Sequence, residues 1–168
     1  MNATNTYAID SFAERASRYC EFCEKTVFTS HHASQLSAFL CSLYEAALQL
    51  PKVGLGYWDD ELPDVPESQL AIVKANLSDF NGFYYSQYFD PDPKFILTSE
   101  PSLGDVGDDL LDIYQDLKRG LLDFQLGKKD GALWYWSRMH SDHWGRHAVG
   151  AIFALHCLVI SKDVKNEL

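Results

Sequence analysis

The sequence is poor in the features that define several large classes of protein. It has only four cysteines in 168 residues, too few for a disulfide-stabilised scaffold, and free thiols are typical of a reducing compartment. No apolar run approaches the roughly 20 residues that cross a bilayer. Residues 1–10 lack the basic and then apolar pattern of a signal peptide. We therefore expect a cytoplasmic protein that does not associate with a membrane.

The sequence also lacks the common catalytic motifs. No serine lies in a G-x-S-x-G turn, and no glycine-rich loop precedes a lysine to bind phosphate. Cys20 and Cys23 form a C-x-x-C pair, but the pair lies within a predicted helix that no strand precedes. Redox pairs and zinc knuckles need a different context, so we interpret both thiols as half-buried packing residues. These absences favour a non-enzymatic protein without a cofactor.

Basic residues are scarce in the middle of the chain. The net charge is −10, from 24 acidic residues and 14 Lys and Arg. Between Asp59 and Asp116 there are fourteen acids and two bases, which gives −12, so the rest of the chain carries +2. Nucleic-acid affinity comes from Lys and Arg that displace counterions, so we do not expect a nucleic-acid ligand. The acidic segment favours fast association with a basic partner, although a solvated surface explains the same charge.

What the sequence does contain is helical periodicity and material for a core, with 46% hydrophobic residues. Apolar residues recur at the spacing of one helical face, and no segment shows convincing strand alternation. The clearest helical segments are residues 7–23, 36–48, 65–80, 110–124 and 132–160. Asp64 and Glu67 have the spacing of a capping box for the third of these. We predict a single all-α domain over residues 1–168, a bundle of five to six helices with a long C-terminal antiparallel helical hairpin.

Two polar rows of equal spacing lie on the two helices of the predicted hairpin. They are His140, His143 and His147, and Asp109, Asp112 and Asp116. Antiparallel pairing about a turn near Lys129 brings Asp116 level with His143, and Asp112 level with His147. Imidazole and carboxylate groups in this arrangement suit Zn, Mn or Fe. The alternative is a buried Asp–His network that satisfies polar groups and fixes the helix register without a metal.

Two stretches of the hairpin are distinctive, DDLLDIYQDLKRGL over residues 108–121 and HWGRHA over residues 143–148. Together with ALH at residues 154–156, they resemble the C-terminal part of a bacterial family, domain of unknown function 5063. Trp134 and Trp136 precede the second stretch at the spacing of that family. The resemblance implies a helical fold and leaves the activity open.

We favour a non-enzymatic binding protein, an immunity protein that neutralises a basic bacterial toxin such as a nuclease by covering its active site. A nuclease cleft is basic because it holds phosphates, so a carboxylate-rich surface complements it. The residues expected to face the toxin are acidic, with an aromatic anchor: Tyr57, Trp58, Asp59, Asp60, Glu61, Asp64 and Glu67. The alternative is a metal-dependent helical enzyme in which a bound ion activates water. Its ligands would be Asp112, Asp116, His143 and His147.

Overall fold

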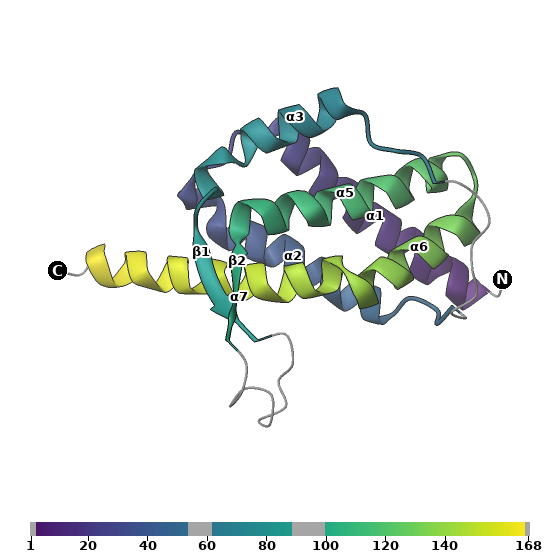
Figure 1. Ribbon diagram of the computed structural model, residues 1–168. Helices are drawn as coiled ribbons and strands as arrows, with labels where there is room; N and C mark the ends of the chain where they lie inside the picture. Colours follow the sequence, from purple (N-terminus) through teal and green to yellow (C-terminus); the bar gives the residue numbers. More distant parts are fainter. Residues whose placement is uncertain (1–2, 54–61, 89–99, 167–168) are drawn as a thin grey trace.

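The computed structural model describes residues 3–53, 62–88 and 100–166, and Figure 1 shows their arrangement. Six α-helices form the body: α1 (Ala3–Lys25), α2 (Ala33–Leu48), α3 (Glu67–Asn76), α5 (Val106–Gln125), α6 (Lys129–Asp142) and α7 (Trp144–Asn166). Two short 3-10 helices, η1 (Ser30–His32) and η2 (Ser78–Phe80), precede α2 and follow α3. The prediction of an all-α fold with a C-terminal helical hairpin is confirmed.

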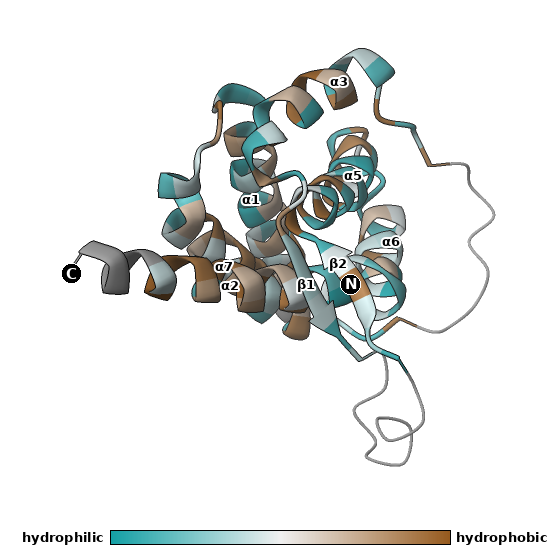
Figure 2. Ribbon diagram, turned by 60° about the vertical axis from the view of Figure 1, so that its left-hand side comes forward, coloured by the Kyte–Doolittle hydropathy of each residue, from teal (hydrophilic) through white to brown (hydrophobic). Residues whose placement is uncertain are grey.

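Helix α5 is at the centre of the packing and contacts α1, α6 and α7. Its buried apolar residues recur every three or four positions: Val106, Leu110, Ile113, Tyr114, Leu117 and Leu121. Figure 2 shows hydrophilic residues beside hydrophobic ones on α1, α3 and α5, as expected of amphipathic helices. The polar positions that alternate with the apolar stripe of α5 carry the aspartates of the candidate site.

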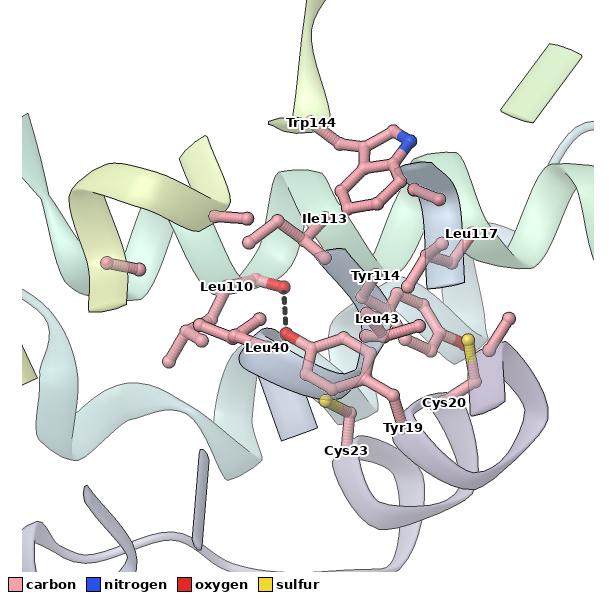
Figure 3. Packing of buried hydrophobic residues seen from close by; sticks show 14 of the residues in the cluster. Tyr19, Cys20, Cys23, Leu40, Leu43, Leu110, Ile113, Tyr114, Leu117 and Trp144 are labelled. Carbon is pink, nitrogen blue, oxygen red and sulfur yellow. Dashed lines mark hydrogen bonds between the residues drawn. The ribbon is translucent and has the colours of Figure 1, made fainter. Parts of the chain in front are cut away.

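Helix α1 joins this core through Tyr19, which is fully buried against α5. Its hydroxyl donates a hydrogen bond to the backbone carbonyl of Leu110 at 2.9 Å (Figure 3). Cys20 and Cys23 lie beside it as free thiols and are fully rather than half buried. Burial raises the pKa of Cys23 to about 12, so the thiol stays protonated and acts as a small apolar residue.

The predicted last helix, residues 132–160, is in fact two helices. His143 separates α6 from α7 with φ −141° and ψ −87°, outside the helical region. A Cβ atom at Gly145 would lie 2.2 Å from the carbonyl oxygen of His140, so the break requires glycine there. The prediction of one helix was wrong because α6 and α7 run on in the same direction (Figure 1), and apolar periodicity does not register a one-residue break.

A small antiparallel hairpin corrects the expectation that no segment forms a strand. β1 (Tyr84–Gln87) pairs with β2 (Ser102–Asp105), with Tyr84 opposite Asp105 and Gln87 opposite Ser102. Strands of four residues are too short for alternation to stand out in the sequence. β1 contacts α7 and β2 contacts α5, so the two strands lie beside both helices (Figure 1).

Helix α7 is long and apolar over residues Trp144–Ser161, enough to cross a membrane by length and composition alone. The core helix of a soluble protein passes the same test. Part of α7 is such a core element, since Trp144, Ala148, Ala151 and Leu155 are buried and the helix packs against α2 and α5. The apolar character of α7 therefore does not decide where the protein resides.

Candidate metal site between α5 and α7

Two histidines at the break between α6 and α7 face the aspartate row of α5. His143 Nδ1 lies 2.8 Å from Asp116 Oδ2, and His147 Nδ1 lies 2.6 Å from Asp109 Oδ1. The predicted pairing of Asp116 with His143 is confirmed. The predicted approach of Asp112 to His147 is also observed, with Asp112 Oδ2 3.7 Å from His147 Nε2. The Nδ1 atom of His147, however, is bound by Asp109.

Each of the two buried carboxylates also accepts a hydrogen bond from a tyrosine. Tyr85 on β1 donates to Asp109 Oδ2 at 2.6 Å, and Tyr135 on α6 donates to Asp116 Oδ1 at 3.0 Å. Burial and the neighbouring carboxylate raise the pKa of both tyrosines well above the usual value, so both hydroxyls stay protonated and donate. Two Tyr–Asp–His chains therefore converge on one place, one from the strand side and one from α6.

The hydrogen bonds of the two imidazoles determine which nitrogen is available. A carboxylate accepts, so each neutral ring carries its hydrogen on Nδ1 and its lone pair on Nε2. One ligand atom each from Asp112, His143 and His147 lie within 4.8 Å of one another, and the imidazole ring centroids are 4.7 Å apart. Ligand atoms around one tetrahedral ion are roughly 3.3 Å apart. Side-chain rotations that shorten these separations would let the three groups bind one metal ion.

The electrostatics of Asp112 favour a cation. Burial raises the pKa of Asp112, although the charges of His147 and His143 act in the opposite direction. The hydrogen bond that His147 donates to Asp109 raises the pKa of His147, against the effect of burial. A partly buried carboxylate with a raised pKa is destabilised in its charged form, and a bound cation relieves that cost.

A cleft of about 470 Å³ opens over these ligands. Its walls come from both strands, the first half of α5 and the start of α7. His143 exposes 44% of its side chain and Asp112 exposes 34%. An ion held here is therefore accessible to small molecules, unlike an ion in a closed structural site.

His140, the third histidine of the predicted row, does not join the site. Its ring packs against Tyr44 and Trp144, with centroid separations of 4.9 and 4.8 Å. Its Nε2 atom is buried without a hydrogen-bond partner among the described residues, and burial lowers the pKa of the ring. Of the three histidines predicted to share one helical face, His140 is therefore excluded from the site, because it lies in α6 before the break at His143.

Two glycines leave the space that the ring of Tyr85 occupies. A Cβ atom at Gly104 on β2 would lie 2.4 Å from Tyr85 Cζ, and one at Gly150 on α7 would lie 2.0 Å from its hydroxyl oxygen. Neither position accepts a side chain while the tyrosine stays in place. The sequence interpretation missed Tyr85 and Tyr135. The one available signal was Gly150 within a helical pattern, because an isolated helical glycine often marks a close contact.

The two predicted partner-binding residues that the structure describes, Asp64 and Glu67, do not belong to this site. Residues 57–61 fall outside the described part of the chain. Asp64 is 89% exposed and its Oδ1 lies 3.0 Å from Arg119 Nη2, while Glu67 is exposed in the first turn of α3. Pro66 takes the N-cap position, so the predicted capping box of Asp64 and Glu67 is wrong. The interface itself stays a prediction.

Comparison with known proteins extends the resemblance from the hairpin to nearly the whole chain. The sequence matches the family Domain of unknown function (DUF5063) over residues 4–161. The crystal structure of protein BF1032 from Bacteroides fragilis is similar, with 26% sequence identity and a TM-score of 0.68, and the match covers 90% of this chain and 94% of that one. The search of curated proteins gave no match. The chain belongs to the DUF5063 family.

Proposed function

We propose that this protein binds a divalent first-row transition metal through Asp112, His143 and His147, and that the ion acts on a ligand that enters the cleft. The observation that carries the proposal is the state of the two imidazoles. A buried carboxylate engages Nδ1 of each ring and leaves both Nε2 lone pairs for a metal. Two histidines and one carboxylate suit Zn, Mn or Fe. Three protein ligands with an open position are typical of catalytic metal sites.

The chemistry that such an ion supplies is activation of water at neutral pH. The protein contributes the cleft in which a substrate meets that water. Asp105, Asp108 and Asp142 lie in its walls, and Arg146 is the one Lys or Arg among its lining residues in the described part of the chain. This balance disfavours anionic substrates. We therefore propose hydrolysis of a neutral or cationic substrate as the class of reaction.

The test is metal binding by the whole chain after treatment with a chelator. Calorimetric titration with Zn²⁺, Mn²⁺ and Fe²⁺ (the last without oxygen) should show one high-affinity ion per chain, and binding should raise the melting temperature. His143→Ala and His147→Ala should each abolish high-affinity binding. His31→Ala is the matched control, because His31 is exposed on η1, outside the site. Equal binding by all three variants, or no stoichiometric binding by the unmodified chain, contradicts the proposal.

The second candidate function, an immunity protein against a basic toxin, rests on the acidic segment and on the exposure of Asp64 and Glu67. The complex should assemble at low salt and persist at high salt, because a specific inhibitor buries apolar area as well as charge. Glu67→Lys should slow its association with a basic partner. Asp130→Lys reverses the charge of an exposed residue in α6, outside the acidic segment, and should slow the association less than Glu67→Lys does. Equal effects of both reversals would count against this interface.

A further inference from the structure

A second pocket, of about 250 Å³, lies between α1 and α2. Its lining residues are Arg15, Arg18, Gln35, Ala38, Phe39 and Ser42. All six belong to α1 and α2, whereas the candidate metal site is built from α5, α7 and the strands. The pocket therefore shares no lining residue with the candidate metal site.

Arg15 is held in a fixed orientation across the two helices. Its Nε donates to Ser42 Oγ on α2 at 3.1 Å, and its Nη1 donates to the backbone carbonyl of Ser11 at 3.3 Å and to the Ser11 hydroxyl. These bonds use Nε and Nη1 and leave the two hydrogens of Nη2 for another acceptor. The orientation of Arg15 is thus set before any ligand arrives.

Arg18 lies one helical turn further along α1 and is exposed. It forms no hydrogen bond or ion pair with any residue in the described ranges, and Arg15 has no carboxylate within 4.0 Å among them. Other cations of this acidic chain do have carboxylate partners: Lys25 with Glu21, Lys118 with Glu24, Arg119 with Asp64, Lys129 with Asp10 and Arg138 with Asp142. Arg15 and Arg18 therefore share a pocket whose lining residues include no carboxylate, in a protein of net charge −10.

One of the lining residues, Phe39, is aromatic. Phe39 is partly buried, and its ring stacks on Phe22 with centroids 4.9 Å apart and an interplanar angle of 30°. Ala38 lies beside it in the lining, and Gln35 contributes an amide one helical turn away. A ligand here meets two positive charges at one side and an apolar surface at the other.

We infer that this pocket binds a phosphate monoester whose organic group is small and apolar or aromatic. Guanidinium groups bind phosphate oxygens through paired N–H donors, and two of them match a dianion better than the single charge of a carboxylate. The organic group packs on Phe39 and Ala38. The pocket is a binding site only, since the groups that line it do not suggest a reaction.

The test is calorimetric titration of the whole chain with phenyl phosphate, inorganic phosphate and benzoate, in the presence of a chelator so that no metal takes part. Phenyl phosphate should bind more tightly than either of the other two. Arg18→Ala should weaken its binding about tenfold or more, as expected when a charged hydrogen-bonding partner is lost. Arg18→Lys should lose part of the affinity, because it keeps the charge without the paired donors. Lys74→Ala, an exposed lysine on α3, should change nothing.

Several outcomes would overturn the inference. Equal losses in Arg18→Ala and Lys74→Ala would mean diffuse attraction to the surface and no site. If benzoate bound more tightly than phenyl phosphate, the preference for phosphate would be wrong. If inorganic phosphate bound as tightly as phenyl phosphate, the proposed contact of the organic group with Phe39 would be wrong. Arg18 is exposed, so its replacement should leave the melting temperature unchanged. Arg15→Ala serves as a second variant wherever its melting curve stays cooperative.

Discussion

The Nδ1 atom of His147 lies 2.6 Å from Oδ1 of Asp109, a carboxylate that is only 4% exposed. His143 and Asp116 repeat this relationship, at 2.8 Å. Nδ1 of each imidazole therefore donates a hydrogen bond to a buried carboxylate, and Nε2 keeps its lone pair for another ligand. This orientation is what separates a candidate ligand site from an ordinary surface pair of histidines.

Replacing Asp109 with Asn should weaken metal binding about 10–100-fold, because the buried charge that fixes the His147 tautomer is lost. Affinity is measured by competition with a chromophoric chelator. Asp130→Asn, which changes an exposed carboxylate on α6, is the control. A folded Asp109→Asn protein with unchanged affinity would show that this carboxylate has no role in metal binding.

Replacing Gly150 with Ala should displace Tyr85, because the new Cβ would lie 2.0 Å from its hydroxyl oxygen. We expect the free energy of unfolding to fall by about 1–3 kcal/mol, as for other overpacked sites, and metal affinity to fall with it. Denaturant titration measures the first effect. Val149→Ala, at an exposed neighbouring position, should change stability by less than about 0.5 kcal/mol. A Gly150→Ala protein of normal stability would contradict the packing described for Tyr85.

The pair of His147 and Asp109 should make the stability of the metal-free protein depend on pH. The folded-state pKa of His147 is raised above 6.5, mainly by the hydrogen bond that its Nδ1 donates to Asp109. The stability that the charged pair contributes is therefore fully present below pH 6.5 and is lost as the pH rises through the raised value. Denaturant titrations between pH 5.5 and 9 should show that the cost of His147→Gln shrinks as the pH increases. A cost that does not vary with pH would exclude this linkage.

Metal affinity should follow the opposite trend with pH. A metal ion binds the neutral imidazole, so binding releases a proton wherever His147 is charged beforehand. Affinity should therefore rise between pH 6 and 8, and calorimetry in buffers of different ionisation enthalpy should detect the released proton. Binding that is equally tight at pH 6 and pH 8 would contradict the involvement of His147.

Replacing Tyr19 with Phe should lower the free energy of unfolding by about 1 kcal/mol, the usual net contribution of a buried hydrogen bond. The substitution removes the hydroxyl that donates to the Leu110 carbonyl while the ring stays in the core (Figure 3). Tyr7→Phe is the control, because Tyr7 is exposed. Equal stability of the two variants would mean that the bond between α1 and α5 contributes nothing to stability.

Much of the fold follows from local sequence. The apolar stripe of α5, ending at Gly127, and the short polar turn before α6 are enough to predict a helical hairpin. The length of the turn also sets the register of that hairpin. The sequence therefore predicts the pairing of Asp116 with His143, which the structure confirms. Periodicity and turn length act over a few residues, so they are visible in the sequence.

The rest of the site depends on contacts between distant segments. Tyr85 reaches Asp109 only because two four-residue strands pair and because Gly104 and Gly150 leave room for its ring. The break at His143 depends on the close approach of Gly145 to His140, which removes His140 from the row. No periodicity encodes such contacts, because they join residues that are far apart in the chain or that depart from helical geometry. Local periodicity thus predicts most of the helices and the facing Asp and His rows. Which of those residues share one site follows from the packing of α5, α7 and the two strands against one another, and that packing joins segments far apart in the chain.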